Sequence, residues 1–194
     1  MYHQWAVRLC EYFYKKSGKE NYNLNIAIYG CELLISSGVT VLFLLAMAGV
    51  TDHFIDTLIF LLFYCPLRQY SGGYHASNYR NCTLCFCIIY FGILCIPNNF
   101  PINVLLIGTG IASVIIWIMA PVEDQNKPLS EKEVIYLKRK SRSILLMELI
   151  VILIMVIIMK EEANRFPLYG ILCVSNLLWI GYIKNMILLR KNKE

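Results

Sequence analysis

Long apolar runs recur along this 194-residue chain, and they limit its possible folds more than any other feature. A helix needs about 20 mostly apolar residues to cross the hydrocarbon core of a bilayer. Six segments reach or approach this length, and they are residues 24–50, 54–67, 82–97, 101–121, 143–159 and 167–189. Charged residues make up 16% of the chain, against about 25% in a soluble domain. The sequence therefore predicts an all-α, polytopic membrane bundle of about six transmembrane helices, forming a single domain over residues 1–194.

The second and third apolar segments are shorter than the others. Pro66 closes the apolar part of the second, and Pro97 ends the third. Stretches of about 14–16 apolar residues also suit tilted or re-entrant elements. A re-entrant arrangement is therefore the alternative for these two segments.

The first 20 residues differ from the rest of the chain because charged residues interrupt their apolar ones. They lack the uninterrupted apolar core of a cleavable signal peptide. Trp5, Leu9 and Tyr12 alternate with charged residues, which is typical of an amphipathic helix that lies in the membrane interface. A solvated N-terminal segment is the alternative.

The distribution of basic residues predicts the orientation in the membrane. Of the 18 Lys and Arg residues, all but Lys160 and Arg165 lie on one side if six spans are drawn. Basic residues favour cytoplasmic loops, so both termini are expected in the cytoplasm. The net charge of +5 then reflects orientation, and it gives no support to nucleic-acid binding.

Residues 67–82, which join the second and third spans, carry the residues most suited to chemistry. A cysteine thiolate is a strong nucleophile, and a histidine can accept its proton and return it to a leaving group. On one straight helix, His75 and Cys82 would lie about 10 Å apart along the axis, so a working pair needs a bend. Gly72 and Gly73 permit such a bend, and a helix that begins near Cys82 would stabilise the thiolate through its dipole. An interfacial histidine, a plain glycine turn and a lining cysteine are the alternative interpretation.

This arrangement resembles the accessory gene regulator B (AgrB) family of membrane peptidases. The family pattern has an arginine, a glycine pair, a histidine two residues later and a cysteine seven after the histidine, here Arg68, Gly72-Gly73, His75 and Cys82. A second family feature is Ala-Pro followed by acidic residues and Asn-Lys-Pro, here within residues 120–129. The chain length and the apolar runs match as well, so the resemblance covers essentially the whole chain.

The resemblance implies a cysteine endopeptidase in the bacterial cell membrane, multi-pass, with its active site on the cytoplasmic side. Such an enzyme removes the C-terminal tail of an AgrD-like peptide pheromone precursor through an acyl-enzyme thioester. A cysteine or serine of the precursor then closes a thiolactone or lactone ring for quorum sensing. The implied partner is this precursor, and no cofactor or metal is implied. The apolar runs make the lipid bilayer a second partner, and a homodimer is expected because spans with Gly, Ser and Ala, such as residues 30–49, can pack closely.

The resemblance also implies roles for single residues. Cys82 is the expected nucleophile and His75 the expected general base and acid. Arg68 either binds the acidic precursor tail, braces the loop or acts as a positive-inside anchor, and Gly72 and Gly73 shape the backbone. Ser77 or Asn78 is a candidate to orient His75.

Other ionisable residues have several interpretations. Buried ionisable groups in a span are costly and often functional, so Glu32 either supports the reaction centre or pairs with a helix neighbour. Glu148 lies near the basic cluster, which favours pairing or snorkelling, and His53 has no recognisable partner. The loop at residues 122–142 is acidic first and then basic; its basic part predicts a topology anchor and a contact with anionic lipid, or a grip on an acidic precursor tail.

Two other functions stay open from the residues alone. Six spans allow a small transporter or channel, although no internal repeat supports it. Cys82-x-x-Cys85 also suits a membrane thiol-disulfide oxidoreductase, but no second cysteine pair lies in an outer loop. A zinc site is not expected, because a second ligand pair at the usual spacing is missing.

Overall fold

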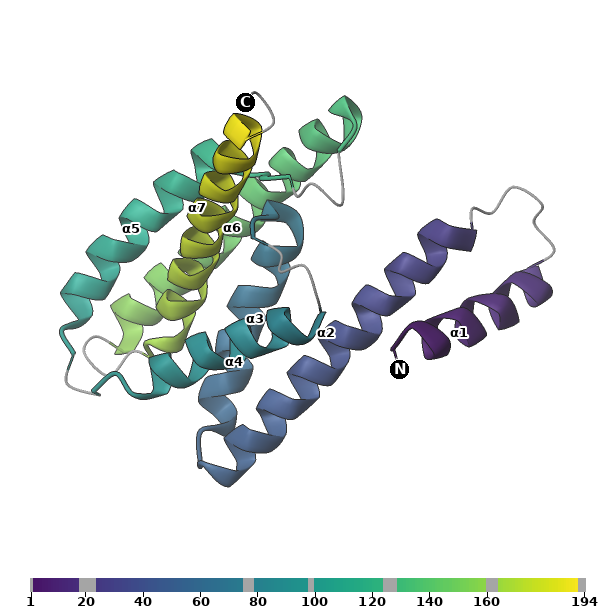
Figure 1. The fold of residues 1–194 in the computed structure, drawn as a ribbon. Coiled ribbons are helices and arrows are strands. Elements are labelled where there is room, and N and C mark those ends of the chain that lie inside the picture. The colour runs from purple at the N-terminus through teal and green to yellow at the C-terminus, as the bar shows by residue number, and fades with distance from the viewer. Residues whose placement is uncertain are drawn as a thin grey trace. The chain divides into compact units, whose positions relative to one another are not determined.

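A computed structural model describes residues 2–17, 24–74, 79–97, 100–123, 129–159 and 164–191 of the chain. These residues form seven helices and one isolated parallel bridge between Gly72 and Val122 (Figure 1). The helices are α1 (Tyr2–Ser17), α2 (Leu24–Val50), α3 (Phe54–Ser71), α4 (Tyr79–Leu94), α5 (Ile102–Met119), α6 (Glu131–Met159) and α7 (Phe166–Lys191). The predicted all-α class is confirmed.

Four helical stretches in the described part are long and apolar enough to cross a membrane. They are Gly30–Val50 in α2, the whole of α5, the whole of α6 and Phe166–Leu188 in α7. The second and third predicted spans are helical as α3 and α4, but neither belongs to this group. The chain is therefore a helical membrane protein with four candidate spans, and the count of six spans and the orientation of the termini remain predictions.

Two helix boundaries differ from the predicted segments. Helix α3 continues through Pro66 to Ser71 instead of ending near residue 67. Helix α6 begins at Glu131, inside the predicted loop 122–142. Its start is a capping box, since the Ser130 N–H donates to Glu133 Oε2 at 2.8 Å and the Glu133 N–H to Ser130 Oγ at 3.4 Å.

The helices form two compact units, which are described separately. The first comprises Met1–Asp52 and Ala76–Ile88, and the second comprises His53–His75 and Ile89–Glu194. In the first unit, α1 packs along α2, and the hydroxyls of Thr40 in α2 and Thr83 in α4 share a 2.8 Å hydrogen bond. In the second unit, α7 packs against α3 and α5, while α6 packs against α3.

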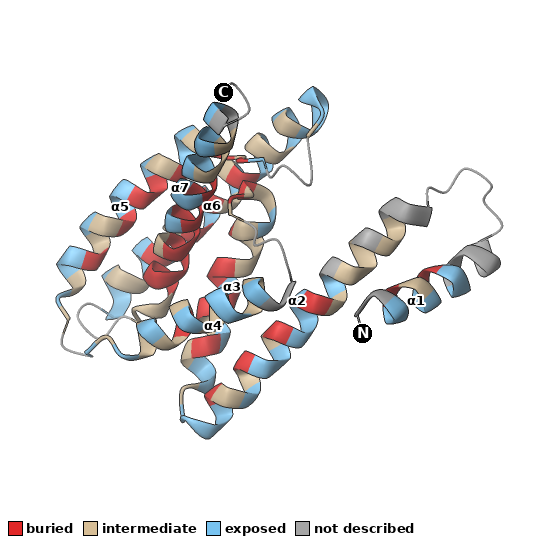
Figure 2. Cartoon of the chain, in the orientation of Figure 1, coloured by how far each residue is buried: buried red, intermediate tan, exposed pale blue. Residues whose placement is uncertain are grey.

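The core of the second unit lies mainly between α3 and α7. Buried residues gather on these two helices (Figure 2), and Phe60, Leu67, Ile171 and Leu178 are fully buried. Helix α6 exposes many large apolar side chains along its length. In a membrane protein, lipid covers such a face, so the exposed apolar surface agrees with the candidate spans.

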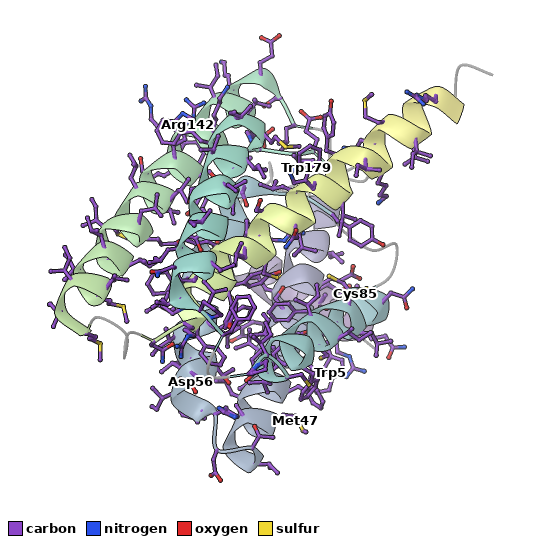
Figure 3. The ribbon with its side chains drawn as sticks, turned by 90° about the vertical axis from the view of Figure 1, so that its left-hand side faces the viewer. Trp5, Met47, Asp56, Cys85, Arg142 and Trp179 are labelled. Atoms are coloured by element: carbon purple, nitrogen blue, oxygen red, sulfur yellow. The ribbon has the colours of Figure 1, made fainter. Side chains whose placement is uncertain are left out.

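Arg142 and Asp56 lie toward opposite ends of the second unit (Figure 3). The guanidinium of Arg142 donates to Trp117 O from Nε at 3.3 Å and from Nη2 at 3.0 Å, and it lies 4.6 Å from the Trp117 ring. These contacts fasten α6 to the end of α5. Asp56 lies in the first turn of α3. The last turn of α3 therefore lies toward the Arg142 end of the unit.

A buried polar network joins α3 to α4 within the second unit. Thr57 and Tyr90 are fully buried, and their hydroxyls hydrogen-bond to each other. The Thr57 hydroxyl also bonds to His53 O at 2.7 Å, where it is necessarily the donor. Tyr90 therefore donates to Thr57, and the Tyr90 hydroxyl depends on Thr57 for its partner.

This order of donation predicts an asymmetric effect on stability. Tyr90→Phe removes one buried hydrogen bond and should cost about 0.5–1.5 kcal/mol. Thr57→Val leaves the Tyr90 hydroxyl buried without its acceptor and should cost about 1–3 kcal/mol. The double variant should be no less stable than Thr57→Val alone, as measured by reversible unfolding in detergent micelles. Additive losses in the double variant would contradict the network.

Candidate functional site

The chain bends sharply at Gly72 and Gly73, directly after α3. Their φ angles are +68° and +107°, values that residues with a side chain rarely adopt. A Cβ atom at Gly72 would lie 2.3 Å from the carbonyl oxygen of Val122, which is closer than real contacts allow. The glycine pair therefore allows a sharp turn of the backbone directly after α3, while the predicted return of His75 toward Cys82 remains a prediction.

The bend joins the two sequence motifs that lie far apart in the chain. The Gly73 N–H donates to Val122 O at 3.1 Å, and the Val122 N–H donates to Ser71 O at 3.0 Å. This reciprocal pair places the Ala120-Pro121-Val122-Glu123 segment beside the end of α3. The described part of the second motif therefore holds the first one in place.

One face of α7 forms the other side of the bend. The Tyr74 N–H donates to Leu177 O at 2.9 Å, and Lys184 Nζ lies 5.2 Å from the centre of the Tyr74 ring. Gly181 lies between these two positions, where an added Cβ would be 2.6 Å from the Tyr74 nitrogen. Residues 177, 181 and 184 follow the spacing of one helix face. Helix α7 therefore holds the backbone of residues 73 and 74 by direct backbone contact.

The same face of α7 also holds the second motif. Asn185 Nδ2 donates to Glu123 O at 2.7 Å. Both motifs therefore contact α7 between Leu177 and Asn185. This role of α7 was not predicted from the sequence; the signals present were Gly181, Lys184 and Asn185 on neighbouring turns of a largely apolar segment.

Arg68 braces the bend from the last turn of α3. Its Nη2 donates a hydrogen bond to Tyr74 O. Its Nη1 is buried beside Gly73 and has no hydrogen-bond partner among the residues that the structure describes. Of the three roles open to Arg68, the observed contact is the one expected for a brace.

Cys82 lies in the first turn of α4, which begins at Tyr79, and it is half-buried. The first N–H groups of a helix have no partner within the helix, so they are natural donors to an oxyanion at this position. Thr83, the next residue, is fixed by its bond to Thr40. His75, Ser77 and Asn78 lie outside the described residues, so the pairing of His75 with Cys82 remains a prediction.

Three further predictions meet different outcomes. Glu32 is half-buried in α2, and its role remains a prediction. The expectation that Glu148 pairs or snorkels is wrong, since its side chain is 4% exposed and neither oxygen has a hydrogen-bond partner in the described part. His53 does have a partner, because its Nδ1 lies 3.2 Å from Asp56 Oδ2, and Asp56 also accepts from Asn164 at 2.8 Å.

No group of three or more His, Cys, Asp or Glu side chains that could hold a metal occurs within the described ranges. The chemistry that these residues support is nucleophilic. A half-buried thiol at a helix start follows a tightly held glycine bend in the chain. The fold and the site thus define a helical membrane protein with a cysteine as its candidate reactive group.

Comparison with known proteins places the chain in a family. The model of the family described as Accessory gene regulator B matches residues 6–183. A putative AgrB-like protein 2 of Clostridium perfringens is 30% identical over 149 residues, which cover 72% of this chain and 70% of that protein. The accessory gene regulator protein B of Staphylococcus intermedius is 26% identical over 161 residues, covering 81% and 84%. The chain belongs to the accessory gene regulator B family, and no solved structure matches it.

A third relative, a putative AgrB-like protein of Listeria monocytogenes, is 32% identical over 119 residues. The matched part covers 58% of this chain and 57% of that protein. The resemblance found in the sequence motifs is thus confirmed at the level of the family.

The contact between α7 and the bend predicts that Gly181 tolerates no side chain. Gly181→Ala should lower the free energy of unfolding by about 1–3 kcal/mol, because its Cβ meets backbone atoms that cannot turn away. Gly92 is the matched control, since a Cβ there meets nothing within 4 Å. Gly92→Ala should stabilise its helix by about 0.5–1 kcal/mol. Equal effects of the two substitutions on unfolding in micelles would exclude a close crossing at Gly181.

Proposed function

We propose that this chain is a membrane-embedded cysteine endopeptidase that matures a peptide pheromone for quorum sensing. Its substrate is an AgrD-like precursor peptide, and its product is a thiolactone or lactone ring. Cys82 is the nucleophile, and His75 is the general base and acid. The reaction takes place at the cytoplasmic face of a bacterial cell membrane.

The main support is the family match over residues 6–183, which includes every residue assigned a role. The structure adds support at the level of the motif. The glycine pair before His75 has positive φ angles, and Val122 and Leu177 accept the N–H groups of residues 73 and 74. A loop held this firmly suits a residue that must meet a nucleophile within hydrogen-bond distance.

The first half of the reaction is acyl transfer to the enzyme. His75 takes the proton of the Cys82 thiol, and the thiolate attacks the carbonyl carbon of the scissile peptide bond. Backbone N–H groups at the start of α4 stabilise the oxyanion that forms. The C–N bond then breaks, and His75 returns the proton to the amine of the leaving C-terminal tail.

The second half closes the ring and frees the enzyme. The acyl group is held on Cys82 as a thioester while a cysteine or serine of the same precursor attacks it. Thioester exchange alters the bond type little, and a tethered nucleophile has a high effective concentration. The Cys82 thiolate leaves and is protonated again. A site shielded from water favours this cyclisation over hydrolysis.

Substitution of the two reactive residues tests the proposal. The full chain in liposomes would be mixed with a candidate precursor, and the released tail would be measured by mass spectrometry. Cys82→Ser and His75→Ala should each lower tail release by about 100-fold or more. An acyl adduct should map to Cys82 in the wild-type chain.

Cys85 provides the control in the same helix. It is exposed and lies one turn beyond Cys82, and Cys85→Ser should leave tail release within about twofold of wild type. A thiol-disulfide oxidoreductase would instead require both cysteines. Loss of turnover in Cys85→Ser, or retained cleavage in Cys82→Ser, would reject the proposed nucleophile.

Arg68→Lys separates a brace from a charge that binds substrate. Lysine keeps the charge but lacks the planar fork that reaches Tyr74 O from the end of α3. If Arg68 positions the loop, kcat should fall about tenfold or more with little change in KM. If Arg68 grips an acidic tail by charge alone, Lys should retain kcat, and Arg68→Gln should raise KM.

A further inference from the structure

Cys10 and Cys31 face each other across the contact between α1 and α2. Their Sγ atoms lie 2.9 Å apart, and both residues are free thiols. Cys10 is 3% exposed, and Cys31 is half-buried. Nothing in the proposed peptidase reaction uses either residue, so this pair needs a separate explanation.

The positions of the two cysteines in the chain agree with this contact. Cys10 lies seven residues before the end of α1 at Ser17, and Cys31 lies seven residues after the start of α2 at Leu24. In two antiparallel helices joined by a short connection, such residues lie at the same height, about 10 Å from the connected ends. Helix α1 indeed runs beside the first half of α2 (Figure 1). The helix geometry therefore brings these two residues to one level.

Helix α1 has two different faces. Ala6 and Cys10, one turn apart, are buried against α2. Trp5, Leu9 and Tyr12 form an apolar ridge that is 67%, 45% and 61% exposed, as in helices that lie in a membrane interface. In the described part of α1, the inward face consists of small side chains. Between residues 4 and 12, this inward face contributes little buried apolar area.

We infer that Cys10 and Cys31 form a reversible disulfide that pins α1 to α2. A disulfide needs a sulfur–sulfur distance of about 2.05 Å, so the two atoms must approach by about 0.9 Å. Small changes in side-chain torsion provide a movement of this size without moving the helices. The device is independent of the proposed peptidase activity, and it gives the chain two states of α1, one pinned and one free.

The oxidant that fits this site is a low-molecular-weight disulfide. The Cys31 thiolate attacks one sulfur of that disulfide, forms a mixed disulfide and releases one small thiolate. Cys10 then attacks the Cys31 sulfur, which closes the Cys10–Cys31 bond and releases the second small thiolate. The two cysteines lose two protons and two electrons, and the small disulfide becomes two thiols.

The environment of Cys10 suits the second of these steps. Burial, and after it the hydrogen bond to Cys31 and that residue's charge, raise the pKa of Cys10 to about 11. A thiol that stays protonated near neutral pH is a poor first nucleophile for an external oxidant. Its position next to Cys31 gives it a high effective concentration once the mixed disulfide has formed.

The test uses the full chain in liposomes, equilibrated with glutathione disulfide and glutathione at increasing ratios. Free thiols are then alkylated, and chymotryptic peptides, which separate Cys31 from Cys65, are analysed by mass spectrometry. We expect a peptide that links Cys10 to Cys31 in most molecules at oxidising ratios, and its loss after dithiothreitol. Amide hydrogen exchange in residues 2–17 should slow about tenfold in the oxidised chain, because the bond suppresses local opening.

The controls use single cysteine substitutions. Cys10→Ser and Cys10→Ala should both abolish the linked peptide and the slowing of exchange. Cys173 is the matched buried cysteine, at 5% exposed, and Cys173→Ser should behave as the wild type. The inference fails if Cys10 stays open to alkylation while the exposed Cys95 is oxidised. It also fails if the bond forms but exchange in α1 is unchanged.

Discussion

The direct contact of three backbone segments at Gly72 and Gly73 is the constraint on which the candidate site depends. A bend after a helix leaves N–H groups without helical partners, and a buried N–H group that stays unpaired costs about 1–3 kcal/mol. Here the N–H groups of Gly73 and Tyr74 donate to Val122 and Leu177. Only residues without a Cβ allow backbones to approach this closely, which explains the glycines at 72, 73 and 181.

The candidate site is therefore not a local feature of one loop. The bend is closed by the segment after α5 and by one face of α7, and Arg142 fastens α6 to the end of α5. Residues 71–73 and Val122, from two motifs far apart in this chain, meet through backbone hydrogen bonds.

Sequence reasoning reached the helices and the bend because both depend on residue type. Apolar runs predict spans, and a glycine pair predicts positive φ angles. It missed the part played by α7, because the carbonyl of Leu177 is a backbone group that any residue would provide. The second apolar segment was expected to end near residue 67, because proline cannot donate the hydrogen bond of a helix interior. The continuation of α3 to Ser71 depends on packing that the sequence does not show. The capping box at Ser130 and Glu133 was visible in the sequence, but the charge pattern of the segment suggested a loop instead.

Arg68 shows how one residue can satisfy several constraints at once. It lies in the last turn of α3, where the helix dipole stabilises a positive charge. On the predicted topology, it also lies on the cytoplasmic side, as basic residues prefer. Its guanidinium donates to the carbonyl of Tyr74, six residues further along the chain, and so contacts the backbone on the far side of the bend. One side chain can therefore meet the requirements of helix electrostatics, of the predicted topology and of the loop backbone at the same position.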